Sequence, residues 1–126
     1  MLIMVVDDEP DIQTLFEQRF RKEIRGGELL FRFAFSGGEA LAVLESAAAT
    51  DLVLILSDIN MPGMSGLELL RQIKARTPGV PVFMITAYDD QEKYREAMDC
   101  GANDYLAKPL DFDELKAKIL SLRKSS

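Results

Sequence analysis

The sequence contains no histidine and no tryptophan, and Cys100 is its only cysteine. Without histidine, the chain lacks the most common metal ligand and general base of proteins, and it cannot be a phosphohistidine carrier. Zinc, copper and iron sites are therefore disfavoured, and any metal should be a hard cation bound through oxygen. A single cysteine cannot form an internal disulfide, which fits a reducing cytoplasm.

Long apolar runs and an excess of positive charge are also missing. No apolar segment approaches the roughly 20 residues that a membrane-spanning helix needs. The first six residues lack the basic flank of a secretory signal. Fifteen lysines and arginines stand against 21 acidic residues, and the formal net charge of −6 argues against direct nucleic-acid binding. We therefore expect a cytoplasmic protein that contacts neither membrane nor nucleic acid.

The composition is that of one globular domain. The chain has 126 residues, 48% of them hydrophobic, which is enough for a core without disulfides. We expect a single domain over residues 1–126, with a core of residues 2–122 and a tail or truncated linker at 123–126.

Short apolar segments alternate with amphipathic ones along the whole chain. The apolar segments predict five strands, at Leu2–Val6, Leu29–Phe35, Leu52–Leu56, Val80–Ile85 and Tyr105–Ala107. A first helix is expected to begin at Pro10. Capping-box spacing predicts four more helix starts, at Ser36 with Glu39, Ser65 with Glu68, Asp89 with Glu92, and Asp111 with Glu114. This alternation predicts a doubly wound α/β fold, a five-stranded parallel sheet with helices on both faces.

Polar side chains follow the predicted strands where each one ends. Asp7 and Asp8 follow the first strand, Asp58 the third, Thr86 the fourth and Lys108 the fifth. Ligands of doubly wound sheets bind at this carboxyl edge. With strand order 2-1-3-4-5, the first and third strands are neighbours and the three carboxylates meet in one crevice.

Three clustered carboxylates call for a cation, and oxygen ligands without histidine favour Mg²⁺. Lys108 and Thr86 offer a positive charge and a hydroxyl to a phosphate, and a carboxylate can attack phosphorus. Each residue also has a simpler explanation, since acids cap helices and lysines are usually solvated. The joint placement at four strand ends favours a site that accepts a phosphoryl group.

Four ordered motifs identify a family. They are VVDDEP at 5–10, SDINMPGMSG at 57–66, ITA at 85–87 and GANDYLAKP at 101–109. With them, the chain resembles the receiver domain of bacterial two-component response regulators over residues 2–122. The resemblance implies a flavodoxin-like sheet of order 2-1-3-4-5.

The resemblance also implies the roles of the acidic residues. Asp58 accepts a phosphoryl group from the phosphohistidine of a sensor histidine kinase or phosphotransfer protein. Asp8 and Asp58 bind Mg²⁺ directly, for which Mn²⁺ can substitute, and Asp7 supports it through water. Asn60 contributes its backbone carbonyl to the metal.

The remaining roles concern the switch. Lys108 pairs with the phosphoryl oxygens and precedes a cis peptide bond to Pro109. Thr86 moves toward the phosphate and Tyr105 turns inward behind it. The surface formed by the helix from about Asp90, the fifth strand and the last helix is then read by a downstream effector or output domain, or forms a phosphorylation-dependent homodimer.

Two features lie where members of the resembled family vary. Asn60 and Tyr88 flank the phosphorylation site and are expected to set the lifetime of the phosphorylated state, with Tyr88 slowing hydrolysis. The stretch from Glu23 to Leu30 is slightly long for the family and is interpreted as a loop variation.

Three other functions are possible for this fold. A phosphohydrolase of the aspartate-nucleophile type needs an acid where Asn60 stands. A nucleotide-binding domain needs a glycine-rich phosphate loop, which the sequence lacks. An interaction module that keeps the acidic pocket without turnover leaves Lys108 and Thr86 without a purpose. We therefore expect a phosphoacceptor switch that catalyses only its own phosphorylation and dephosphorylation, and not an enzyme of external substrates.

Overall fold

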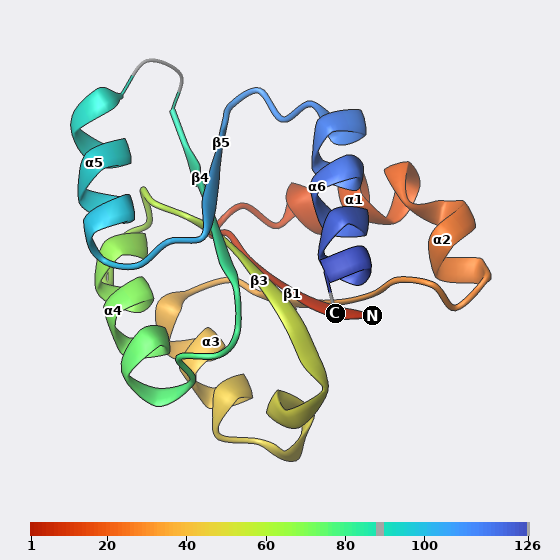
Figure 1. Ribbon diagram of the computed structural model, residues 1–126, viewed down its shortest axis with the longest axis horizontal. Helices are drawn as coiled ribbons and strands as arrows, with labels where there is room; N and C mark the ends of the chain where they lie inside the picture. The colour runs from red at the N-terminus through yellow and green to blue at the C-terminus, as the bar shows by residue number, and fades with distance from the viewer. Residues whose placement is uncertain (88–89, 126) are drawn as a thin grey trace.

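The structure is a computed structural model, and it describes residues 1–87 and 90–125. Strands and helices alternate along the chain, as the sequence predicts (Figure 1). The elements are β1 (Leu2–Val6), α1 (Asp11–Arg19), α2 (Arg21–Arg25), β2 (Leu30–Ala34), α3 (Gly37–Leu44), a 3-10 turn (Ala47–Asp51), β3 (Leu52–Asp58), α4 (Gly66–Arg76), β4 (Val82–Thr86), α5 (Gln91–Asp99), β5 (Asp104–Ala107) and α6 (Phe112–Ser125).

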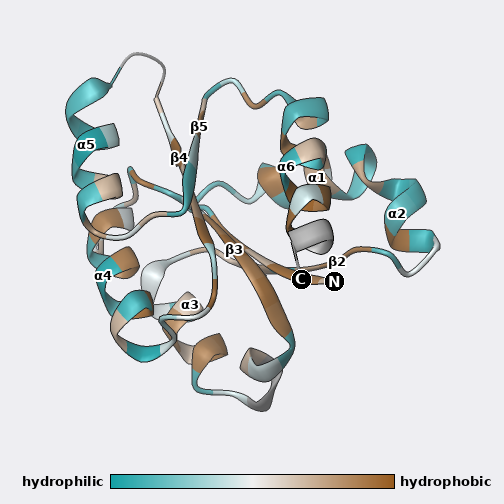
Figure 2. Ribbon diagram, viewed as in Figure 1, coloured by the Kyte–Doolittle hydropathy of each residue, from teal (hydrophilic) through white to brown (hydrophobic). Residues whose placement is uncertain are grey.

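The five strands form one parallel sheet of order β2-β1-β3-β4-β5, which confirms the predicted topology. β1 lies between β2 and β3 and pairs with both in parallel. Its continuous apolar run is therefore buried on both faces, as is usual for a central parallel strand. The strands form the apolar centre of the molecule, and the polar faces of the helices point outward (Figure 2).

Helices cover the two faces of the sheet in separate groups. Side chains of α3, α4 and α5 pack on one face, against Met4 and Ile55 among others. On the other face, α1 and α6 enclose Ile3 and Val5 together with a group of phenylalanines. These two cores enclose the sheet from both sides.

Three of the four predicted caps are confirmed. The hydroxyls of Ser36 and Ser65 accept hydrogen bonds from the backbone N–H three residues later, at 3.1 and 3.2 Å. Asp111 accepts one from the N–H of Glu114 at 3.1 Å. The fourth cap was wrong by one residue, because Asp90 caps α5 and accepts from the N–H of Lys93. Asp89 lies outside the described residues.

The predicted boundaries need small corrections. β3 continues past Leu56 through Ser57 to Asp58, so the proposed phosphoacceptor is the last strand residue. β4 begins at Val82, because the preceding Pro81 has no backbone N–H for the ladder. β2 is one residue shorter than predicted at each end, and β5 begins one residue earlier than predicted.

The stretch from Glu23 to Leu30 is not only a loop. α1 ends at Arg19, the backbone of the following Phe20 leaves the helical region, and α2 forms a further short helix before Gly26. The backbone N–H groups of Glu28 and Leu29 return to the carbonyl of Glu23 and close this turn. The extra helix lies beside α6, which matters for the second pocket described below.

Candidate functional site

The predicted polar residues meet at the carboxyl edge of the sheet. Asp7 and Asp8 follow β1, Asp58 ends β3, Thr86 ends β4 and Lys108 follows β5. The strands that carry them are neighbours in the order β1-β3-β4-β5. The fold therefore brings residues from opposite ends of the sequence, such as Asp7 and Lys108, into one crevice.

Three carboxylates form the acidic side of this crevice. One oxygen from each of Asp7, Asp8 and Asp58 lies within 4.8 Å of the others, close enough for all three to hold one metal ion. Asp7 and Asp58 are both only 3% exposed, whereas Asp8 is half-buried. An all-oxygen set of this kind suits a hard divalent cation.

Burial raises the pKa of Asp7 above its ordinary value. A hydrogen bond from the backbone N–H of Glu9, at 3.0 Å, opposes this shift. The nearby charges of Asp58 and Asp8 raise the pKa of Asp7 further, and Lys108 lowers it. The raised pKa means that the folded chain resists holding a full set of negative charges here without a cation.

Lys108 forms the basic side of the crevice. Its Nζ lies 2.9 Å from Oδ2 of Asp58, in an ion pair whose acid is almost fully buried and whose lysine is partly exposed. Burial lowers the pKa of Lys108, but the hydrogen bond and charge of Asp58, with the charges of Asp7 and Glu9, raise it to a net value above the ordinary one. Lys108 is therefore a firmly protonated cation beside the Asp58 carboxylate. The Lys108–Pro109 peptide bond is cis, as the resemblance implied.

Thr86 is fully buried, and its hydroxyl has no hydrogen-bond partner among the described residues. A buried hydroxyl without a partner costs about 1–3 kcal/mol. The backbone carbonyl of Thr86 accepts a hydrogen bond from the N–H of Lys108 at 2.8 Å, which ties the two strand ends together. The hydroxyl is thus an unused donor beside the crevice.

The backbone after Asp58 is held by a close contact that sequence reasoning did not assign. The N–H of Gly66 donates to the carbonyl of Ile59 at 2.8 Å, so the start of α4 lies against the end of β3. A Cβ on Gly66 would lie 2.1 Å from the carbonyl oxygen of Asp58. Only glycine fits here, and the signal was a glycine directly after the Ser65 cap.

Two of the predicted tuning and switch residues, Asn60 and Tyr105, lie within the described part of the chain. Asn60 is exposed, and its backbone N–H donates to Oδ1 of Asp58 at 3.3 Å. Tyr105 is half-buried on β5, with its ring centroid 4.3 Å from that of Tyr94 on α5. Tyr88 lies outside the described residues.

A groove of about 620 Å³ runs from the crevice between α1 and the segment after β5. Asp7, Glu9 and Lys108 line its polar end, while Ile12 and Leu15 are among its apolar walls. Leu15 is one of the few large apolar side chains exposed on the described surface. Helical spacing with Ile12 and Phe16 favours a buried position for Leu15, so the sequence alone does not reveal this groove.

The family model of the response regulator receiver domain matches residues 3–120. The chain belongs to the response regulator receiver domain family. Such domains are the signalling switches of two-component systems, and the family inferred from the four motifs is confirmed.

Relatives and solved structures agree with this placement. The receiver is 41% identical over 118 residues to the DNA-binding transcriptional regulator NtrC of Salmonella typhimurium, which covers 94% of this chain and 24% of NtrC. It is 39% identical over 117 residues to the transcriptional regulatory protein ZraR of Escherichia coli K12, covering 93% of this chain and 25% of ZraR. The chain thus spans about a quarter of the length of these curated relatives.

Among solved structures, the receiver domain of NtrX from Brucella abortus superposes with a TM-score of 0.83 at 33% identity, covering 98% of this chain and 99% of that one. A receiver domain protein from Clostridium thermocellum gives a TM-score of 0.85 at 28% identity, with 98% and 96% covered. Within the described residues, no helix is both long and apolar enough to cross a membrane.

Proposed function

We propose that this receiver is a phosphoryl-accepting switch in which Asp58 is the nucleophile. A carboxylate oxygen of Asp58 attacks the phosphorus of a phosphohistidine on a sensor histidine kinase or phosphotransfer protein. The phosphorus–nitrogen bond breaks, and the imidazole leaves with its electron pair and takes up a proton. The observation that carries this proposal is the placement of the buried Asp58 carboxylate between two other acids and Lys108, 2.9 Å away.

The acidic side of the crevice fits Mg²⁺, with Mn²⁺ as a substitute. Asp8 and Asp58 would bind the ion directly, Asp7 would support it through water, and Asn60 would offer its backbone carbonyl. When bound, such an ion offsets the repulsion between an attacking carboxylate and an anionic phosphoryl group. The clustered carboxylate oxygens and the raised pKa of Asp7 support this assignment.

On the basic side of the crevice, Lys108 leaves its ion pair with the Asp58 carboxylate and pairs with the new phosphoryl oxygens instead. Thr86 donates its unpartnered hydroxyl to another of these oxygens, which removes the cost of leaving it unsatisfied. Movement of Thr86 leaves space behind it for Tyr105, which turns further inward. A charge change at one carboxylate is thereby linked to β5 and to the adjoining α5 and α6, as a two-state switch requires.

The switched α5–β5–α6 surface is read by an effector or by an output domain, and it is the surface for a phosphorylation-dependent homodimer. NtrC and ZraR carry the names of transcriptional regulators and are about four times as long as this chain. The receiver itself forms one domain, acts in the cytoplasm and contacts no nucleic acid. Asn60 and Tyr88 set the lifetime of the acyl phosphate, and we expect Tyr88→Ala to shorten it.

The test is the intact mass of the protein after incubation with acetyl phosphate, with and without Mg²⁺. We expect wild type to gain one phosphoryl group only with Mg²⁺, and Asp58→Asn to gain none. The matched control is Asp99→Asn, which alters an exposed acid on α5 and should behave as wild type. If neither acetyl phosphate nor phosphorylated kinases modify wild type, the proposal is wrong and a non-turnover interaction module is favoured.

A further inference from the structure

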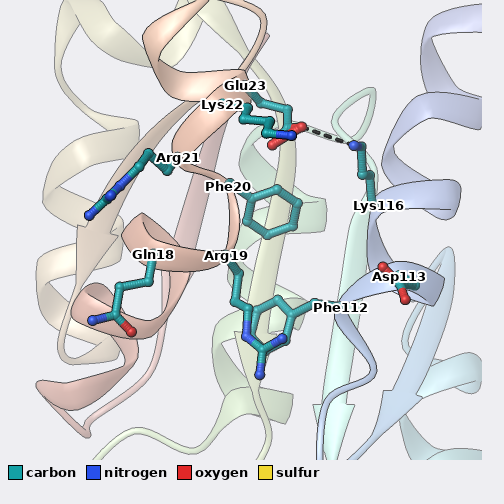
Figure 3. Close-up of a pocket in the computed structure, with 9 residues that line it drawn as sticks. All are labelled: Gln18, Arg19, Phe20, Arg21, Lys22, Glu23, Phe112, Asp113 and Lys116. Atoms are coloured by element: carbon teal, nitrogen blue, oxygen red, sulfur yellow. Dashed lines mark hydrogen bonds and ion pairs between the residues drawn. The ribbon is translucent and has the colours of Figure 1, made fainter.

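A second pocket lies between the α1–α2 corner and the first turns of α6 (Figure 3). It contains none of the crevice acids, but it adjoins the groove beside α1, with which it shares Arg19 and Phe112. Its volume is about 400 Å³, within the range of small-molecule sites. Its lining carries four basic side chains against two acidic ones, which are Arg19, Arg21, Lys22, Lys116, Glu23 and Asp113. Without Arg21, which points away from this space, three cations stand against two acids, so the pocket has a small local excess of positive charge on a chain whose formal net charge is −6.

Three of the cations lie around the same space. Figure 3 shows Lys22 and Lys116 at one end of the pocket and Arg19 at the other, with the ring of Phe20 between them. The Arg19 guanidinium lies over the ring of Phe112, 5.5 Å from its centroid. Arg21 points to the other side of α1 and α2.

The charges of this pocket are only partly compensated within the protein. Lys116 pairs with Glu23 at 2.9 Å and joins α6 to α2. That pairing lowers the pKa of Glu23 and raises the pKa of Lys116. Within residues 1–87 and 90–125, no carboxylate is within ion-pair distance of Arg19 or Lys22. Arg19 and Lys22 thus lie outside the ion pairs of the described residues, although the charges of Lys22 and Glu23 attract each other, and Lys116 is shared with Glu23.

The cluster of cations and the concave shape of the pocket together indicate which kind of ligand would fit it. A phosphate group carries several acceptor oxygens and about two charges, so it can accept charge-assisted hydrogen bonds from several cations at once. A concave site with aromatic residues in its lining suits a small molecule better than a flat macromolecular surface. The acidic crevice at the strand ends repels the same anion in the absence of a divalent ion.

We propose that this pocket binds a small phosphate-bearing anion through Arg19, Lys22 and Lys116. Glu23 is the internal competitor, because it gives up Lys116 when the ligand enters. The ligand is either a free polyphosphate or a nucleotide, which share this chemistry. The proposal goes beyond the phosphoryl switch and does not depend on it, since it concerns binding at other residues.

The test is calorimetric titration of the whole chain with inorganic triphosphate, and separately with ATP, at physiological salt and with EDTA. We expect saturable binding of one anion per chain. Lys22→Ala should weaken it about tenfold, the loss of one charge-assisted hydrogen bond. The control Arg25→Ala removes an equal charge from the same helix but outside the pocket, and it should change affinity less than about twofold.

Glu23→Gln should tighten triphosphate binding several-fold, because it removes the competing charge while leaving a side chain of the same shape. Tighter binding of ATP than of triphosphate would identify a nucleotide, and equal binding would identify the phosphates alone. Absence of saturable binding, or equal weakening by Lys22→Ala and Arg25→Ala, would overturn the proposal. Glu23→Gln without tightening would overturn the role of Glu23 as competitor.

Discussion

Gly66 makes the closest backbone approach of the site. An added Cβ would lie 2.1 Å from the carbonyl oxygen of Asp58 and 2.6 Å from the Cα of Ile59, and neither backbone atom can move without displacing the proposed nucleophile. We expect Gly66→Ala to lower the free energy of unfolding by about 3 kcal/mol and to slow phosphorylation by acetyl phosphate. Urea unfolding and intact mass measure the two effects.

Gly79→Ala is the matched control for this substitution. Nothing lies within 4 Å of a Cβ built on Gly79. The free energy of unfolding of Gly79→Ala should therefore differ from that of wild type by less than about 1 kcal/mol. If both alanine variants unfold at the same urea concentration, the close approach of Gly66 to the backbone of Asp58 does not affect the free energy of unfolding.

Asp7 provides a test of the electrostatics through pH. Its pKa in the folded chain is raised, chiefly by burial, above the ordinary value of 3.8. The folded state therefore binds this proton more tightly than the unfolded state, and the ionised Asp7 costs stability as pH rises through that window. Asp7→Asn removes the charge, while its side-chain oxygen can still accept from Glu9.

We therefore expect Asp7→Asn to be more stable than wild type at neutral pH without divalent ions, with the advantage vanishing as pH falls toward 3.8. Thermal unfolding from pH 3.5 to 8 in EDTA measures this. An advantage that grows on acidification would contradict the sign of the pKa shift. Added Mg²⁺ should stabilise wild type more than the variant.

The elements show what the sequence could and could not predict. β1 was predicted with its correct ends, because a fully apolar strand passes directly into Asp7. α2 was missed because Ile24 is its only apolar residue, and the stretch from Glu23 to Leu30 was interpreted as a loop. The cap of α5 was misplaced because two adjacent aspartates fit the spacing almost equally well.

Some features of the candidate site could likewise be predicted from the sequence, and others could not. The sequence shows that the carboxylates and Lys108 stand at the ends of predicted strands. Their convergence in one crevice follows once those strands are neighbours in the sheet. The isolation of the Thr86 hydroxyl and the approach of Gly66 depend on three-dimensional packing, which no spacing rule contains. The groove beside Leu15 also required the structure, because helical spacing alone assigns that leucine to the core.

α5 is the most weakly attached of the helices flanking the proposed switch. Ala97 is its only buried residue, so its stability should depend strongly on its cap. We expect Asp90→Ala to destabilise the chain by about 1 kcal/mol and to speed amide hydrogen exchange across α5. Glu96→Ala, an exposed change within the same helix, is the control and should leave exchange nearly unchanged. Equal exchange rates in the two variants would show that the Asp90 cap does not limit opening of α5.

At the scale of the whole molecule, the acidic crevice opens directly into the groove beside α1. We expect a partner that presents a phosphohistidine to dock on the apolar wall of this groove, to which Leu15 and Ile12 contribute. We expect Leu15→Asp to slow transfer from a phosphorylated kinase about tenfold or more and to leave phosphorylation by acetyl phosphate unchanged. Comparing the two donors separates docking from chemistry. Equal slowing with both donors would place the defect in the crevice and not in docking.

The central claim is that Asp58 becomes an acyl phosphate, and chemical trapping tests it most directly. Borohydride reduces an aspartyl phosphate to homoserine, which marks the modified residue by mass. After phosphorylation with acetyl phosphate and Mg²⁺, peptide mass spectrometry should find homoserine at position 58 and unmodified aspartate at positions 7 and 8. Homoserine at another position, or a phosphoryl group that survives reduction on a serine or threonine, would contradict the account.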